Sequence, residues 1–177
     1  MISRARHIVS RILAWSLIAL MFAAVVNVLW QVFTRWVLND PSSYTEELAR
    51  YLLIWVGLLG AAYAAGEKMH LAIDLLPSRL TGSGKHLLEI AIEALVLLFA
   101  LSVMVVGGYR LVSLTLLMGQ RSAALGVQLG IVYMVLPLAG ILIVFYASVS
   151  ILERVRALRG KRADLIEPDR STQKPID

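Results

Sequence analysis

The chain has 177 residues, of which 59% are apolar and only 16% are charged, and its mean hydropathy is +0.76. Soluble domains are closer to half apolar and a quarter charged, so this excess of apolar side chains indicates an integral membrane protein. The absence of cysteine excludes disulfides and thiolate chemistry. The net charge of +5 does not indicate nucleic-acid binding, because the basic residues gather at the termini and at helix ends.

Four apolar runs are long enough to cross a bilayer, which takes about 20 helical residues. Open strands would leave backbone groups unpaired in lipid, so the sequence predicts an all-α protein with four transmembrane helices. We expect one membrane domain over residues 1–158, followed by a polar tail at 159–177 that is largely disordered. The predicted spans are 12–34, 46–66, 87–109 and 130–152.

The first apolar run is expected to remain in the mature protein. Basic residues precede it, as in a secretory signal, but its 23 uncharged residues are too many for a cleavable signal segment. It ends in aromatic and charged residues rather than in small residues before a cleavage site. We therefore interpret it as a retained transmembrane helix.

Orientation follows from the distribution of Lys and Arg near the helix ends. Eleven of them lie at the two termini and in the loop after the second span. The opposite side has four, which are Arg35, Arg50, Arg110 and Arg121. This asymmetry predicts that both termini are cytoplasmic.

The start of the second span carries a cluster of polar residues. Ser43 precedes Glu46 by three residues, a spacing that predicts a capping box. Glu46 and Glu47 also suit the positive end of the helix dipole, and Arg50 is placed to pair with Glu46. Two adjacent acids beside Tyr44 would also make a docking edge for a partner protein. Both interpretations, a helix cap and a docking edge, fit the residues.

Two amides in the first span and several small residues in the second indicate helix association. Asn27 and Gln31 share a helix face, and amides in lipid seek partners on another helix of this chain or of a second protein. Small residues let helix backbones approach closely. They form two rows in the second span, Gly57, Ala61 and Ala65 in one and Gly60 and Ala64 in the other.

Two further segments are expected to lie at the membrane interface. Residues 69–76 alternate apolar and polar side chains, including His70 and Asp74, which suits a short amphipathic helix. A single helix over 87–119 would span about 50 Å, against a bilayer core of about 30 Å. Gly107 and Gly108 offer a bend that would lay the following residues along the interface, and strong tilt is the alternative.

The residues give no sign of an enzyme or of a cofactor or metal site. No ionisable residue lies near the middle of a predicted span, where an ion-binding site would need one. The histidines, His7, His70 and His86, all fall outside the spans, so no facing pair could ligate haem. Hydrolase, metalloprotease and phosphate-loop motifs are absent from the sequence.

With these residues in view, the chain resembles the small membrane subunit of TRAP (tripartite ATP-independent periplasmic) transporters, the DctQ family. The family signature has an aromatic residue, two glutamates, an arginine–aromatic pair, an apolar run, a Gly-Ala-Ala stretch and a histidine before a Val/Ile-Asp segment. Here it reads Tyr44, Glu46, Glu47, Arg50, Tyr51, Trp55, Gly60, Ala61, Ala62, His70, Ile73 and Asp74. The exit from the first span and a proline in the last span also match, at Phe33, Arg35, Trp36, Asn39 and Pro137.

The resemblance implies a non-catalytic scaffold in the bacterial inner membrane. In this family a large membrane subunit carries the substrate and sodium sites and moves as an elevator, and a periplasmic binding protein delivers an organic acid such as a C4-dicarboxylate or a sialic acid. The expected partners are these two proteins and the lipid bilayer. The expected interface residues are Arg35, Tyr44, Glu46, Glu47, Arg50, Trp55, Gly57, Gly60, Ala61, Ala64, His70 and Asp74.

Two other functions compete with this interpretation. A four-helix anchor subunit of a membrane oxidoreductase would bind haem or quinone, and the lack of histidines within the spans argues against it. A small exporter working as a homodimer would transport without a large subunit, and transport by this chain alone would identify it.

Overall fold

The computed structural model describes residues 2–40, 42–67 and 83–166. These residues form helices and loops, and no strand is among them. The helices are α1 (Ile2–Trp36), α2 (Ser43–Gly66), α4 (Ser83–Phe99), the π-helix η2 (Ala100–Gly107), α5 (Gly108–Leu117), α6 (Leu129–Tyr133) and α7 (Val135–Ile166). The segment at 69–76, with His70 and Asp74, lies outside the described residues.

Among the described residues, four helical segments are long and apolar enough to cross a membrane, which confirms the predicted all-α fold with four transmembrane helices. They are Arg6–Trp36, Ser43–Gly66, Ile90–Leu117 and Leu129–Glu153. α7 continues to Ile166, past residue 159, where we expected the polar tail to begin.

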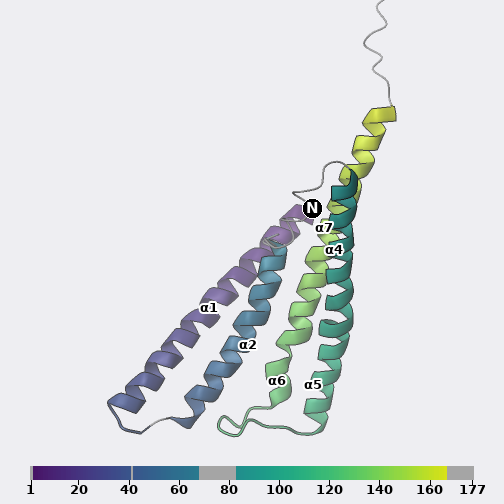
Figure 1. The fold of residues 1–177 in the computed structure, drawn as a ribbon. Helices are drawn as coiled ribbons and strands as arrows, with labels where there is room; N and C mark the ends of the chain where they lie inside the picture. Colours follow the sequence, from purple (N-terminus) through teal and green to yellow (C-terminus); the bar gives the residue numbers. More distant parts are fainter. Residues whose placement is uncertain (1, 41, 68–82, 167–177) are drawn as a thin grey trace, which may run out of the picture.

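The helices stand in a row whose order differs from the order in the chain (Figure 1). α1 packs on α2, α2 packs on α7, and α7 packs on α4 and η2. The fourth span therefore lies between the second and the third. We call the end with the α1–α2 connection and loop 118–128 the loop end, and the end with the N-terminus the terminal end.

The third span continues through the two glycines at which a bend was one of two alternatives, the other being strong tilt. Helix extends without interruption from Ser83 to Leu117, and Gly107 and Gly108 have helical φ values of −64° and −61°. Of the two alternatives, the bend is therefore wrong, and Gly108 has a packing role instead. A Cβ on Gly108 would lie 2.9 Å from Cδ of Pro137, so this glycine allows close contact between α5 and α7.

The fourth span is interrupted where the sequence has a proline. α6 ends at Tyr133 and α7 begins at Val135. In a continuous helix the ring of Pro137 would clash with the carbonyl of Tyr133, whereas in the first turn of a new helix its missing N–H costs no bond. Met134 fills the break, and its carbonyl accepts a bond of 3.2 Å from the amide of Leu138.

α7 is the central helix of the core. Its side chains Val135, Ala139, Ile143 and Tyr146 form one buried cluster with residues of α1, α2 and η2. Two further glycines allow this close packing. A Cβ on Gly66 would lie 2.7 Å from the ring of Tyr146, and one on Gly140 would lie 2.8 Å from Cβ of Met104.

Polar contacts join α1, α2 and α7 at the terminal end. The hydroxyls of Ser10 and Tyr146 are buried and 3.1 Å apart. Arg6 donates to the carbonyl of Gly66, and its Nη1 lies 3.8 Å from Oε2 of Glu153. These contacts hold the three helices together at this end of the bundle.

The glycine pair of the third span offers a matched test of this packing. We expect Gly108→Ala to lower the stability of the protein by about 1–3 kcal/mol, the usual cost of overpacking. Gly107→Ala should be neutral or slightly stabilising, because its Cβ would meet only the carbonyl of Ser102 at 3.8 Å. Thermal unfolding of both variants in detergent measures the difference. Equal melting temperatures would contradict the close contact with Pro137.

Candidate partner-binding surfaces

The α1–α2 hairpin is held by a buried side-chain amide. Nδ2 of Asn27 donates a 2.8 Å hydrogen bond to the carbonyl of Thr45, and Thr45 is fully buried. This carbonyl would otherwise lie in a water-poor environment without a second partner. The structure thus gives Asn27 a partner within the chain, one of the two alternatives left open by the sequence.

The beginning of α2 differs from the predicted capping box. Ser42 flanks the helix, and no side-chain bond from it caps the first-turn amides. Instead its hydroxyl lies 2.8 Å from that of Thr45, whose hydroxyl in turn lies 2.9 Å from the Ser42 carbonyl. The predicted Ser43–Glu46 box is therefore wrong, because Ser43 is already the first helical residue and the Thr45 hydroxyl satisfies Ser42.

Glu46 and Arg50 form the predicted pair on the surface of the loop end. Nη2 of Arg50 lies 2.5 Å from Oε1 of Glu46, and both side chains are about two-thirds exposed (69% and 67%). Exposed pairs of this kind add little stability, so the two charges remain available to a partner. Tyr44 is also exposed, and its hydroxyl accepts a 3.0 Å bond from Nε1 of Trp30. Arg35 is exposed at the end of α1.

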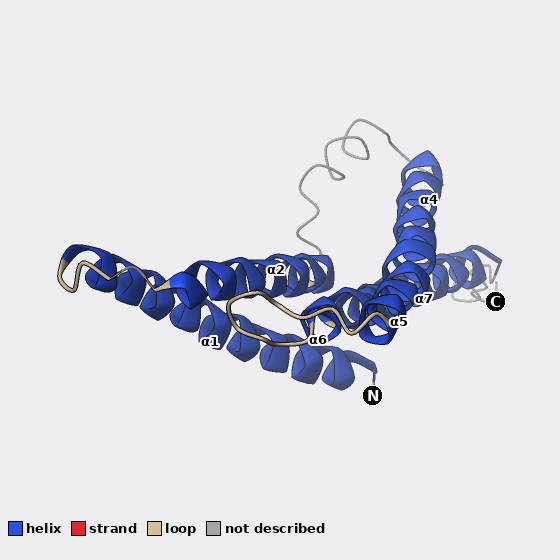
Figure 2. Cartoon of the chain, turned by 90° about the horizontal axis from the view of Figure 1, so that it is seen from below, coloured by secondary structure: helices blue, strands red, loops and turns tan. Residues whose placement is uncertain are grey.

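Glu47 faces into the chain instead. Its Oε1 accepts a 2.7 Å bond from the hydroxyl of Tyr51. Its Oε2 accepts the backbone amides of Ala124 and Leu125, at 2.9 and 3.2 Å. Figure 2 shows the loop between α5 and α6 running back toward α2, where these bonds form. The adjacent acids therefore have different roles, since Glu46 is on the surface and Glu47 binds a loop.

Loop 118–128 has an ordered fold of its own, for which Glu47 is the anchor on α2. The amide of Ser122 donates 2.8 Å to the carbonyl of Val127, and the amide of Leu129 donates 3.0 Å to that of Gln120. Gly126 has a φ of 67°, which favours glycine. Sequence reasoning missed this contact. Its one signal was a short run of small and polar residues with a glycine between two spans, which predicts a turn but not its partner.

Trp55 joins α2 to the interruption in the fourth span. Its Nε1 donates a 3.0 Å bond to the carbonyl of Val132, one residue before the end of α6. Its ring packs against the core cluster. Trp55 was predicted as an interface residue, and the structure gives it an internal contact between α2 and the fourth span.

The small residues of α2 lie on the face that points away from the core. Gly57 and Ala61 are exposed, and Gly60 and Ala64 are half-buried. A Cβ on Gly57 or on Gly60 would meet nothing within 4 Å in the part of the chain that the structure describes. By contrast, the glycines that face other helices of this chain leave no room for a Cβ. We call this surface, made by Gly57, Gly60, Ala61 and Ala64, the open face of α2.

These features define a class of protein, a four-span membrane protein. Asn27, Glu47 and Trp55 make contacts within the chain, and the small residues of the open face of α2 are uncovered. Within the described ranges, no group of three or more His, Cys, Asp or Glu could hold a metal ion.

Comparison with known proteins identifies the family within this class. The model of the DctQ component of tripartite ATP-independent periplasmic transporters matches residues 24–157. The sialic acid TRAP transporter small permease protein SiaQ of Vibrio cholerae is 31% identical over 160 residues, which cover 88% of each chain. The chain belongs to the DctQ family of TRAP transporter components, as its residues predicted, and it is a multi-pass protein of the bacterial inner membrane.

Two Haemophilus influenzae proteins are also similar. One is described as a TRAP transporter small permease protein and is 27% identical over 137 residues, which cover 77% of this chain and 83% of that protein. The other is the sialic acid TRAP transporter permease protein SiaT. It is 37% identical over 57 residues, which cover 32% of this chain and 9% of SiaT.

Glu46 lies on the surface and Glu47 binds loop 118–128, so replacing each of them should affect this loop differently. Replacing Glu47 with Ala removes the acceptor of two amides, and hydrogen bonds to charged groups contribute about 1.5–3 kcal/mol. We therefore expect amide hydrogen exchange at Ala124 to accelerate about tenfold or more, and that at Leu125 to accelerate less, because the Leu125 amide also donates to the Ser122 hydroxyl at 3.1 Å. Glu46→Ala is the matched control and should leave both amides unchanged. Slow exchange in Glu47→Ala would show that the loop folds without this carboxylate.

Proposed function

We propose that this chain is the small, non-catalytic scaffold subunit of a TRAP transporter that imports an organic acid. The observation that carries the proposal is the family match over residues 24–157, together with the internal use of the polar side chains at the helix contacts. A scaffold must hold its helices in fixed positions while a neighbouring subunit moves. The close contacts of α7 with Gly66, Gly108 and Gly140 support this role.

The partner subunits, and not this chain, would determine which acid is transported and which ion gradient drives its transport. The Vibrio cholerae relative is named for sialic acid, which makes sialic acid or a related acid the first substrate to test. The coupling is proposed to be to an ion gradient, with sodium as the coupling ion. The substrate and ion sites would lie in a large elevator-type permease subunit, to which a periplasmic binding protein delivers the acid.

Association with a large subunit has independent support from the partial match to SiaT. A segment similar to 57 residues of this chain occurs within that permease protein, of which it makes up 9%. A small-subunit segment that is joined to a larger permease would be held close to it. We infer that this chain, which is separate from its large subunit, contacts that subunit in the same membrane.

The open face of α2 is the surface we assign to that contact. Lipid gives no hydrophobic driving force between helices, so association depends on close packing, and small residues allow it. Gly57, Gly60, Ala61 and Ala64 provide such a surface. At the loop end the exposed Arg35, Tyr44, Glu46 and Arg50 are proposed to contact the binding protein or the large subunit. Glu47 and Trp55 would act through the segments they position, and His70 and Asp74 remain expected interface residues.

The orientation of the chain is proposed from its basic residues, with both termini in the cytoplasm and the loop end in the periplasm. Because the natural chain has no cysteine, single cysteines can report the side of the membrane. In intact cells an impermeant thiol reagent should label Ala123→Cys in loop 118–128. It should label Glu67→Cys, at the terminal end, only after the membrane is permeabilised. The reverse pattern would invert the assignment.

Assembly with the large subunit is tested by bulky substitutions on the open face. We expect Gly57→Leu combined with Ala61→Leu to abolish co-purification of the large permease subunit in mild detergent. The variant should still insert and fold, because both positions are exposed and a Cβ on Gly57 would meet none of the described residues within 4 Å. Ala94→Leu, a small-to-large change at a position of α4 that is also exposed, is the control and should leave assembly intact. Full recovery of the complex from the double variant would exclude this face as the interface.

A further inference from the structure

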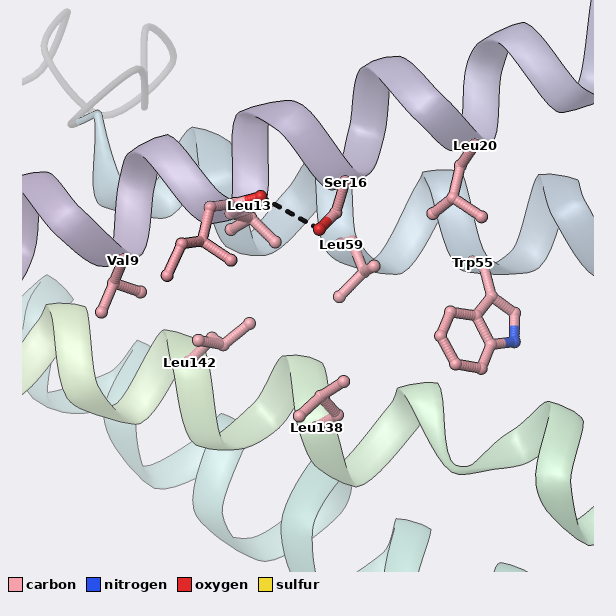
Figure 3. A pocket seen from close by; sticks show the side chains of 9 residues that line it. Val9, Leu13, Ser16, Leu20, Trp55, Leu59, Leu138 and Leu142 are labelled. Carbon is pink, nitrogen blue, oxygen red and sulfur yellow. Dashed lines mark hydrogen bonds between the residues drawn. The ribbon is translucent and has the colours of Figure 1, made fainter.

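A wedge-shaped cavity of about 520 Å³ lies between α1, α2 and α7. Figure 3 shows α1 and α7 on its two sides, with Leu59 and Trp55 of α2 between them. Leu13, Ser16 and Leu20 face it from α1, and Leu138 and Leu142 face it from α7. Ligand sites for small molecules have volumes of about 300–1,000 Å³, so this space is large enough for a chain-like ligand.

The wedge exists because two helices are joined at one end and diverge from there. At the terminal end, the Ser10–Tyr146 contact and Arg6 hold α1 close to α7. Farther from this end, α1 leans away from α7 (Figure 1). The resulting gap lies within the apolar segments that are long enough to cross a membrane, so its surroundings are the bilayer and any partner protein.

The lining of the wedge is suited to an apolar occupant. The Ser16 hydroxyl donates a 3.0 Å bond to the carbonyl of Ile12 in its own helix. The Trp55 Nε1 donates to the Val132 carbonyl at 3.0 Å. All other lining side chains are aliphatic. A polar ligand would lose hydrogen bonds with water and gain none here, whereas a hydrocarbon chain would lose nothing.

The length of the wedge matches one leaflet of a bilayer. Its lining on α1 extends from Val9 to Leu20, and eleven steps of about 1.5 Å give about 16 Å. One leaflet contributes about half of a hydrocarbon core of about 30 Å. The wedge begins near the terminal end and reaches Trp55, near the middle of α2. An acyl chain that entered from the terminal end would therefore fit along its whole length.

A cation lies where the phosphate of such a lipid would be. Arg6 is one helical turn before Val9, on the terminal side, and it is only partly exposed (23%). Arg6 donates from Nη2 to the carbonyl of Gly66, and its Nη1 is 3.8 Å from the Glu153 carboxylate, beyond hydrogen-bond distance. A guanidinium has five N–H donors, so Arg6 has donors left for a lipid phosphate. Basic residues at the membrane surface attract lipid phosphates in this way.

We propose that the wedge between α1, α2 and α7 binds one acyl chain of a phospholipid from the leaflet at the terminal end, with the lipid phosphate beside Arg6. The bound lipid fills the gap and fixes the angle between α1 and α7. This site is separate from the open face of α2, because Gly57 and Ala61 lie about 160° around the helix axis from Leu59. The inference does not depend on the proposed transport function.

The site can be tested by filling it with a side chain. In native mass spectra of the full chain, and of its complex with the large subunit, the natural protein should retain a phospholipid after washing with delipidating detergent. Ser16→Phe places a ring in the wedge and should lose the bound lipid. Ser102→Phe is the matched control. Ser102 also bonds the carbonyl four residues back, at 2.7 Å, but it is exposed outside the wedge, and its variant should keep the lipid.

A second measurement locates the occupant. The full chain is reconstituted with Trp55 as its only tryptophan, after replacement of Trp15, Trp30 and Trp36 by Phe, in vesicles whose phospholipids carry bromine near the chain end. We expect strong quenching of Trp55 fluorescence, and relief of quenching in Ser16→Phe but not in Ser102→Phe. Equal quenching in both variants would overturn the proposal. Loss of quenching upon addition of a tryptophan-free large subunit would also overturn it, because a protein helix would then fill the wedge.

Discussion

The fold depends on the constraint that polar groups within a bilayer must find partners inside the protein, since the hydrocarbon supplies none. Several contacts among the described residues provide such partners, and they connect different segments of the chain. Asn27 donates to the carbonyl of Thr45, Trp55 donates to that of Val132, and the hydroxyls of Ser10 and Tyr146 pair with each other. At the loop end, Glu47 accepts two backbone amides of the loop before the last span. The bonds within the spans also hold pairs of helices in position, so the contacts that satisfy buried polar groups also stabilise the arrangement of the helices.

Close packing of the neighbouring helices against α7 also stabilises the fold. The last span enters the row between the second and the third, and glycines on its neighbours or on α7 itself give it room. Gly57 and Gly60 of α2 make no such close contact with the described residues of this chain. A helix that packs tightly on one face and leaves small residues on the other is suited to join two parts of an assembly. The contrast between the packed face and the open face of α2 supports the proposed role as a fixed element beside a moving subunit.

The sequence alone predicted the four spans and the family. It did not predict the roles of residues whose partners are distant in the sequence. Hydropathy defined four spans because lipid imposes a length and an apolar composition that few other folds share. The signature residues from Tyr44 to Asp74 indicated the family, which the comparisons confirmed. The role of Glu47 could not be predicted, because its partners are more than seventy residues away in a loop without a motif. Gly108 was misjudged for a similar reason, since a helical glycine next to a proline of another helix has the same local sequence as a bend.

The central claim is that this chain supports transport without performing it. Uptake of radiolabelled sialic acid into proteoliposomes under an inward sodium gradient, with the binding protein present, tests it most directly. We expect no uptake with this chain alone, and uptake when it is combined with its large permease subunit. Gradient-dependent uptake or efflux by vesicles that contain only this chain would contradict the claim, and would identify a transporter complete in itself.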